Sequence, residues 1–180
     1  MTTHQFTLIV EGPDLQTDAS ADALYDEGCD DALVGRLDGV QFLDFDREAP
    51  TLREAVLSAV DDAERVEGVE VVRLADAGLV SMADIANRTS RTRESVRLLI
   101  AGDRGPGGFP PPVTDPRSRY RLWRWTEVER WLTIHFRDDL AQPEDHILEA
   151  INAGLELRHH GRYVSRDDRR ELQELVGVRE

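Results

Sequence analysis

The clearest hydrophobic pattern in the first third of the chain is that of a helix. Thr51 and Glu54 have the spacing of a capping box, and the apolar residues behind them recur every three or four positions. Gly68 is placed to end this segment. The pattern therefore predicts an amphipathic helix whose buried face consists of Leu52, Ala55, Val56, Ala59, Val60 and Ala63.

Short runs of β-branched and aromatic residues surround this helix and are typical of strands. Asp38 and Gly39 separate two of these runs and supply the positive-φ residues that a hairpin turn needs. A further helix, capped by Asp18 or Ser20, is expected to run to about Glu27. Strands are expected at residues 6–10, 32–34, 40–45 and 69–74.

The resulting order of strand, helix, strand, strand, helix, strand is that of ferredoxin-like domains, the βαββαβ arrangement. Such a domain covers one face of its sheet with helices. Because the third strand has apolar residues on both faces, with Val40 and Phe42 on one and Leu43 and Phe45 on the other, we expect the second face to pack against another subunit or domain.

A different pattern, between residues 81 and 100, predicts a helix-turn-helix. Ser81 and Asp84 have a capping spacing before a short helix with an apolar face. Residues 87–91 are expected to form the turn, and Thr92 to cap the second helix. In the second helix, Val96, Leu99 and Ile100 are expected to point inward and Arg93, Glu94 and Arg97 outward.

A loop rich in Gly and Pro follows at residues 102–113, and residues 120–123 then predict a strand. Arginines flank this strand, which indicates a basic β-wing. Thr126 and Glu129 have capping-box spacing and are expected to open a further helix that packs on a core. We interpret Trp123, Trp125 and Trp131 as core and wing anchors rather than as platforms on which single-stranded bases stack.

Charge is distributed unevenly over these segments. The net charge of −14 by itself argues against nucleic-acid binding, which depends on Lys and Arg. However, residues 81–137 contain 11 Arg against 6 Asp and Glu, whereas residues 1–80 contain 5 against 19 and residues 138–180 contain 6 against 11. The basic excess thus coincides with the predicted helix-turn-helix.

The helix-turn-helix, the Phe109-Pro110-Pro111-Pro112 loop, the basic strand and the helix with Val128 and Trp131-Leu132 together resemble the winged helix-turn-helix of the MerR-type and excisionase-like superfamily. The resemblance covers about a third of the chain. It implies a DNA-binding transcriptional regulator or a recombination directionality factor, whose second helix reads the major groove and whose wing holds the backbone or the minor groove. It implies base contacts by Thr92, Arg93, Glu94 and Arg97 and wing contacts by Arg117, Arg119 and Arg121.

Other arginines of the segment suit contacts with the phosphate backbone. Arg88 and Arg91 in the turn region are expected to touch phosphates, and Arg124 continues the basic strand of the wing. The competing interpretation is a helical scaffold whose arginines are solvated and balance acidic residues elsewhere. The helical spacing, the wing and the local charge agree with one another and favour DNA binding.

The C-terminal residues 138–180 predict two amphipathic helices, one from Pro143 to just before Gly161 and one from Ser165 to Val176. Helices in this position often pack on a DNA-binding module or pair between subunits. The histidines lack i, i+4 ligand spacing, and the single Cys29 has no partner for a disulfide, so we expect neither a metal nor a cofactor.

The chain is therefore expected to be an α+β protein with an acidic ferredoxin-like domain at 1–78, a winged helix-turn-helix at 79–137 and C-terminal helices at 138–180. We expect a sequence-specific double-stranded DNA-binding protein, a homodimer that regulates transcription. The alternative is an adaptor or antitoxin-like protein whose N-terminal domain docks on a protein. The sequence also leaves open whether that domain binds a small molecule.

Two function classes are not expected. The carboxylates have no calcium-loop spacing, and there is no nucleophile–base constellation, so we expect no enzyme. No apolar run approaches the roughly 20 residues of a spanning helix, and the N-terminus lacks an export pattern. We therefore expect a cytoplasmic protein that makes no membrane contact.

Overall fold

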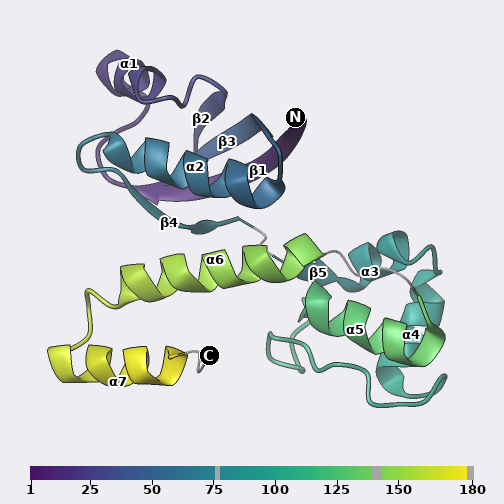
Figure 1. Cartoon of the computed structure of the whole chain (residues 1–180). Coiled ribbons are helices and arrows are strands. Elements are labelled where there is room, and N and C mark those ends of the chain that lie inside the picture. The colour runs from purple at the N-terminus through teal and green to yellow at the C-terminus, as the bar shows by residue number, and fades with distance from the viewer. Residues whose placement is uncertain (76–77, 139–142, 178–180) are drawn as a thin grey trace. The chain divides into compact units, whose positions relative to one another are not determined.

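A computed structural model describes residues 1–75, 78–138 and 143–177, with side chains undescribed at 143–145 and 176. The chain forms two compact units (Figure 1). The sheet unit consists of Met1–Ala75 and the described chain from Ala150 onward, and the central unit consists of the described residues within Asp76–Glu149. The boundary between them falls inside the long helix α6 (Pro143–His160).

The sheet unit is a mixed α/β structure built on one antiparallel sheet. Its strands lie in the order β2-β3-β1-β4, so β1 occupies a central position and β2 and β4 form the two edges. Every neighbouring pair is antiparallel. The strands are β1 (Thr2–Glu11), β2 (Ala32–Leu37), β3 (Val40–Ala49) and β4 (Glu70–Leu74), and the helices between them are α1 (Asp18–Asp26) and α2 (Leu52–Arg65).

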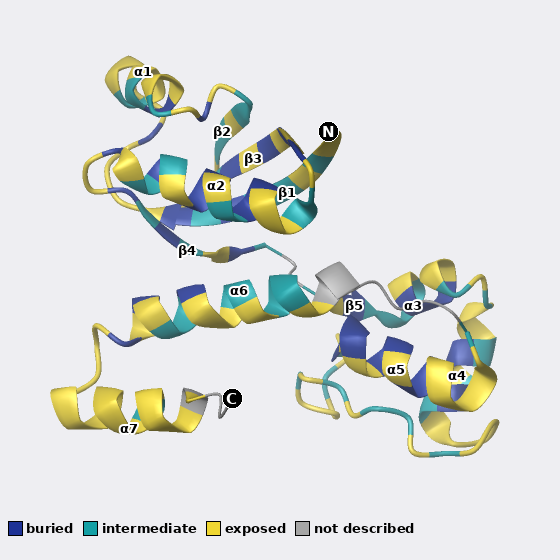
Figure 2. Ribbon diagram, in the orientation of Figure 1, coloured by how far each residue is buried: buried dark blue, intermediate teal, exposed yellow. Residues whose placement is uncertain are grey.

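Helices cover one face of this sheet. Alternate residues of β1 and β3 are buried, as expected for strands with one covered face. Phe6 of β1 stacks on Phe45 of β3 with ring centroids 5.2 Å apart. The core beneath α2 includes Leu8, Val10, Leu43, Phe45, Ala55, Val56, Ala59, Val60 and Ala63 (Figure 2).

Several local predictions for this unit are confirmed. Thr51 caps α2 by accepting a hydrogen bond from the Glu54 amide at 3.2 Å. Asp38 and Gly39 have φ values of 51° and 85°, the left-handed conformation that a two-residue hairpin turn needs. The cap of α1 was predicted wrongly. Thr17 caps this helix rather than Asp18 or Ser20, because the Thr17 hydroxyl accepts from the Ser20 amide.

Strand β3 extends four residues beyond the predicted range 40–45 and continues to pair with β1. The hydrophobic pattern did not predict this extension, because a charged residue occupies a position on the covered face. Arg47 lies on the covered face and is buried. Its guanidinium donates to Asp31 at 2.9 Å, to Asp62 at 2.7 Å and to the Gly28 carbonyl at 2.6 Å. These partners come from two other segments, so the hydrophobic pattern along β3 alone gives no sign of them.

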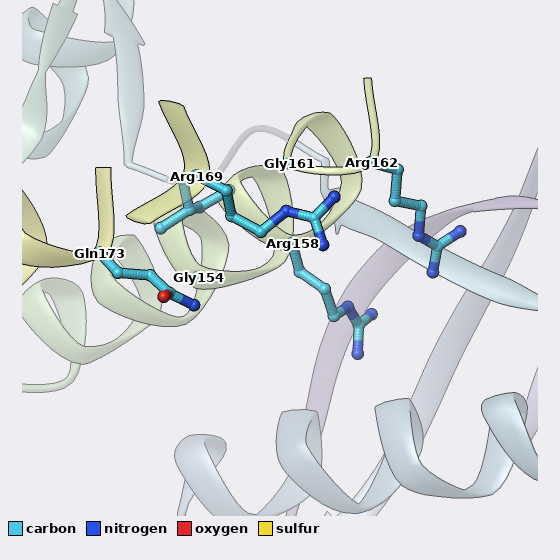
Figure 3. Close-up of a pocket in the computed structure, with 7 residues that line it drawn as sticks. Gly154, Arg158, Gly161, Arg162, Arg169 and Gln173 are labelled. Carbon is cyan, nitrogen blue, oxygen red and sulfur yellow. The ribbon is translucent and has the colours of Figure 1, made fainter. Parts of the chain in front are cut away.

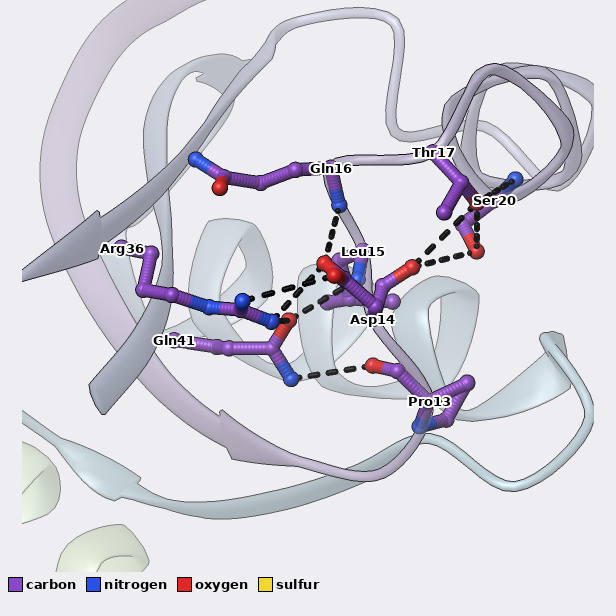
Figure 4. A network of polar contacts seen from close by, with 8 residues as sticks. All are labelled: Pro13, Asp14, Leu15, Gln16, Thr17, Ser20, Arg36 and Gln41. Carbon is purple, nitrogen blue, oxygen red and sulfur yellow. Dashed lines mark hydrogen bonds and ion pairs between the residues drawn. The ribbon is translucent and has the colours of Figure 1, made fainter. Parts of the chain in front are cut away.

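A second polar cluster fixes the loop before α1 (Figure 4). The Gln41 side chain is buried on the covered face. It donates to the Pro13 carbonyl at 2.9 Å and accepts from the Leu15 amide at 2.8 Å and from Arg36 at 3.0 Å. Because both ends of this buried amide have hydrogen-bond partners, these bonds offset the cost of its desolvation and join β3 to the loop.

Side chains cover the outer edge of β4. The Val71 amide donates to Glu64 at 2.9 Å and its carbonyl accepts from Arg158 at 2.9 Å. The Leu74 amide donates to Asn152 at 2.7 Å. Arg158 and Asn152 belong to the second half of α6, so this helix satisfies backbone groups that an edge strand would otherwise leave open.

The last helix, α7 (Arg166–Val176), lies within the predicted range and is capped by Ser165, and its described side chains are exposed except the half-buried Leu172 (Figure 2). Among the described residues, no helix combines the length and apolar character that crossing a membrane requires.

Cys29 lies in the buried part of the sheet unit, and burial raises the pKa of its thiol to about 11. About one thiol in a thousand is ionised at pH 8, so we expect alkylation by iodoacetamide to be at least ~100-fold slower than for the unfolded chain. Mass spectrometry of timed samples, with and without 8 M urea, measures the ratio. Equal rates would show that the thiol is accessible in the folded protein.

Candidate nucleic-acid interface

The central unit contains three helices packed around one hydrophobic core. The helices are α3 (Met82–Arg88), α4 (Arg93–Ala101) and α5 (Trp125–Phe136), and β5 (Leu79–Ser81) pairs with β6 (Leu122–Arg124) in a two-stranded sheet. The core consists of Val80, Ile85, Ala86, Val96, Leu99, Trp123, Trp125, Val128, Trp131 and Leu132.

The short helix α3 begins at the predicted cap. Ser81 accepts from the Asp84 amide, and the Asp84 carboxylate accepts from the Ser81 amide at 2.9 Å, which completes a capping box. The Ser81 hydroxyl also donates to the Asp84 carboxylate at 2.6 Å, and this bond together with the one from the Ser81 amide holds the pKa of Asp84 below its usual value. A tight turn with Ser90 at φ 53° then leads into α4.

We expect Ser81→Ala to lower the free energy of unfolding of the central unit by about 1 kcal/mol, the usual effect of losing an N-cap. All three tryptophans lie in this unit, so their fluorescence during urea unfolding reports on it alone. The folded pKa of Asp84 is depressed, so its stabilising contribution is present above the unfolded pKa and is lost as pH falls through the folded pKa. The difference between wild type and variant should therefore shrink in strong acid, and an unchanged difference there would contradict this account.

Helix α4 has one buried side and one polar side, as predicted. Val96 and Leu99 are buried in the core, whereas Arg93, Glu94 and Arg97 are exposed. Thr92 caps the helix by accepting from the Ser95 amide at 3.1 Å, so its hydroxyl proton stays available to a ligand. The four residues expected to contact bases thus lie at the solvent-facing N-terminal turns of α4.

Two of these residues bind each other. The Arg97 guanidinium donates twice to Glu94, at 2.9 Å and 2.8 Å. This contact lowers the pKa of Glu94 and raises that of Arg97. Because the pair is exposed to water, breaking this ion pair costs little free energy. The Arg97 guanidinium therefore remains able to leave Glu94 and donate to the edge of a guanine base. Within the described residues, Arg93 is exposed and forms no ion pair, so its guanidinium is available to a ligand.

The β-ribbon differs from the predicted wing. The strand is Leu122–Arg124 rather than residues 120–123, and its partner β5 immediately precedes α3. Residues 103–121 form the loop between α4 and the ribbon. Among the predicted wing residues, only Arg124 lies in a strand, and Arg117, Arg119 and Arg121 lie in the loop before it.

Some of the predicted phosphate contacts already have partners. The Arg91 guanidinium binds the Asp138 carboxylate at 2.6 Å and lies 5.3 Å from the Phe136 ring centroid, so it already has two partners within the protein. The Arg124 guanidinium lies 3.8 Å from the Glu149 carboxylate. The Arg117 guanidinium binds the Asp115 carboxylate and lowers the pKa of that carboxyl. Arg88 is exposed and its guanidinium lies over the Trp125 ring.

The carboxylates of Asp138 and Glu149 were not identified from the sequence as parts of this surface. Both lie beyond residue 137, the expected end of the module. Local sequence carries no signal for them, because only tertiary packing brings them to Arg91 and Arg124.

Tryptophans anchor the long Gly- and Pro-rich loop. Trp123 donates to the Pro110 carbonyl at 3.1 Å and Trp131 donates to the Gly107 carbonyl at 3.2 Å. Phe109 packs edge-on against Trp131 with centroids 5.0 Å apart. The interpretation of the tryptophans as anchors is confirmed, since all three are buried and cannot stack on bases.

The expected capping box at the start of α5 is wrong. The helix begins at Trp125, with Arg124 as its N-cap and no side-chain cap. The Trp125 amide donates to the Gly78 carbonyl at 2.7 Å. Thr126 is therefore already helical and buried, and its hydroxyl donates to Glu149 at 2.9 Å.

One cavity outside this unit, of about 400 Å³, lies between α6 and α7 (Figure 3). Arg158, Arg162 and Arg169 line it, but Arg158 binds Glu64 and Arg162 binds Glu70. Figure 3 shows both side chains pointing away from α7. The cavity is therefore not a ready anion site.

No group of three or more His, Cys, Asp or Glu side chains placed to hold a metal ion occurs among the described residues. Comparisons of the chain with protein-family models, curated proteins and solved structures give no match.

Proposed function

We propose that the chain is a sequence-specific double-stranded DNA-binding protein that regulates transcription. The single observation that carries this proposal is the polar side of α4, where Thr92, Arg93, Glu94 and Arg97 are exposed opposite the buried Val96 and Leu99. An exposed, N-capped helix with arginines in its first turns has the shape and donors that fit a major groove.

The surroundings of α4 support the same proposal. The α3–turn–α4 pair is held by its own core, and a short β-ribbon with an adjoining arginine-rich loop follows it. We propose that this is a winged helix-turn-helix of the MerR and excisionase type, in which Arg88, Arg117, Arg119, Arg121 and Arg124 hold DNA phosphates. For the sheet unit, the order β2-β3-β1-β4 favours a ferredoxin-like fold.

Acidic flanks would raise the selectivity of this module. Residues 81–137 carry an excess of five positive charges, but the chain as a whole carries −14. Repulsion between the acidic remainder and DNA weakens indiscriminate binding, so base contacts must supply more of the affinity.

The test is a selection of bound fragments from sheared genomic DNA of the source organism, with the full chain as bait at 0.15 M salt. We expect a small set of fragments that share a sequence to be enriched over input. Enrichment of none, or of all fragments equally, would reject the proposal.

We further propose that the protein binds as a homodimer, because one module of this size rarely gives enough affinity and operators are commonly two-fold. Light scattering of the free protein and of the operator complex measures this directly. One chain per operator fragment would reject the dimer while leaving DNA binding intact.

A further inference from the structure

The two edges of the sheet in the sheet unit are unequal. Side chains of Glu64, Asn152 and Arg158 bind the outward backbone groups of β4. The opposite edge, β2, has no such cover among the described residues. It contains no Pro, and its one charged residue, Arg36, is engaged by Asp14.

The backbone groups that β2 leaves open can be assigned from its register. The Asp46 amide donates to the Asp31 carbonyl at 3.1 Å, so these two residues form a hydrogen-bonded pair. Because such pairs alternate along antiparallel strands, Leu33, Gly35 and Leu37 bond to β3. The amides and carbonyls of Val34 and Arg36 therefore point away from the sheet, and no other described residue bonds to them.

An apolar stripe adjoins this edge on the sheet face opposite the helices. Leu33 and Leu37 are 67% and 68% exposed, and Val40, opposite Leu37, is 46% exposed. Between them, the Phe42 ring lies over Gly35, where an added Cβ would meet it at 2.1 Å. Glycine at this position lets Phe42 lie flat, so the stripe continues across β2 and β3.

A hollow of about 520 Å³ lies at one end of the stripe. Ile9, Val40 and Val72 form its apolar wall, and Glu11 and Arg73 place one charge of each sign beside it. Ile9 stands opposite Phe42 in the sheet, so the hollow is continuous with the stripe.

Charge identifies the kind of partner. Residues 14–46, which include α1, β2 and most of β3, contain ten Asp and Glu against a single Arg. Asp44 and Asp46 lie on the same sheet face as the stripe, with Asp44 opposite Leu33. A second copy of this chain would bring the same acidic residues to the edge and be repelled, whereas a basic segment would be attracted.

We propose that β2 and its apolar stripe bind an extended, basic segment of another protein as an added strand. Main-chain hydrogen bonds to Val34 and Arg36 supply affinity. Alternate side chains of the segment contact Leu33, Leu37 and Val40, and its Lys or Arg residues meet Asp44 and Asp46. The interaction does not depend on the proposed DNA binding, since the surfaces belong to different units.

The test is a selection from a random dodecapeptide phage library with the full chain as bait, followed by fluorescence anisotropy with the enriched peptides. We expect Lys- and Arg-rich peptides with alternating apolar residues. Their affinity should fall at least ~10-fold for Leu33→Ser with Leu37→Ser, which changes only exposed side chains, and for Val34→Pro, which removes an outward N–H. Leu175→Ser, a matched change of an exposed leucine on α7, should leave the affinity unchanged.

Further measurements separate the possible outcomes. Asp44→Asn with Asp46→Asn should weaken peptide binding and lower its dependence on salt concentration. Hydrogen exchange of the Val34 and Arg36 amides should slow in the complex.

The proposal is overturned if no peptide is enriched, if the peptides are not basic, or if the Leu33/Leu37 variant binds them like wild type. A dimer that this variant dissociates in light scattering would overturn it in favour of self-association. The Arg93→Ala, Arg97→Ala variant should bind the peptides normally.

Discussion

Arg93→Ala combined with Arg97→Ala is expected to abolish selective binding to an enriched operator fragment. A bidentate contact between an arginine and a base contributes about 1–3 kcal/mol to discrimination, so the double variant should lose roughly 30-fold to 10⁴-fold in the ratio of specific to non-specific affinity. Both side chains are exposed and neither packs in the core. The loss therefore reports on recognition and not on folding.

The measurement is a gel-shift titration against the operator and a scrambled fragment. Arg53→Ala with Arg170→Ala is the matched control, because it removes two exposed arginines from helices of the sheet unit. Tryptophan fluorescence confirms that the central unit stays folded. An unchanged specificity ratio in the Arg93/Arg97 variant would refute base contacts by α4.

Arginines proposed to hold phosphates should behave differently. Arg119→Ala should weaken operator and scrambled fragments alike, and should reduce the slope of log affinity against log salt by about 1. The two classes of variant therefore distinguish base recognition from backbone binding within one set of titrations.

Arg47→Met is expected to cause the largest loss of stability in the sheet unit, about 3 kcal/mol. The Arg47 side chain is 8% exposed and binds the carboxylates of Asp31 and Asp62, which are themselves partly buried. Burial alone lowers the pKa of Arg47, but hydrogen bonds with the two carboxylates outweigh it and raise the pKa. Methionine fills similar space but leaves the Asp31 carboxylate and the Gly28 carbonyl without the Arg47 donor, and leaves Asp62 with Arg65 alone.

Arg65→Ala provides the matched control for this variant. Arg65 binds the same Asp62 carboxylate at 2.8 Å but is 58% exposed, so its loss should cost no more than about 1 kcal/mol. Urea unfolding followed by Cys29 alkylation measures the sheet unit, in which the thiol is buried. Similar urea midpoints for the two variants would contradict the prediction that Arg47 contributes more to the stability of this core than Arg65.

Predictions that depended on neighbouring residues in the chain were the most successful. The amphipathic pattern of α2, the Asp38-Gly39 turn and the caps at Ser81 and Thr92 each depend on a few residues that are close together in the chain. Sequence spacing predicts such local features well, because the interacting groups lie within four residues of one another.

Apart from the cap of α1, errors arose where a distant group replaced the local one. Residues near Thr126 have the pattern of a capping box, but the Gly78 carbonyl receives the Trp125 amide and the helix begins earlier. A charged residue at position 47 falls inside a strand because carboxylates from two other segments satisfy it.

The sequence by itself therefore determined the helices, the strands of the sheet unit, their order along the chain, and the segment in which arginines outnumber acidic residues, but not strand β5. Helix periodicity, turn residues and caps are properties of contiguous chain, so they can be recognised without a fold. The tertiary structure alone decided which arginines already have partners, which sheet edge α6 covers and which edge stays open. These features depend on groups far apart in sequence, whose meeting is set by packing and burial and not by any local pattern.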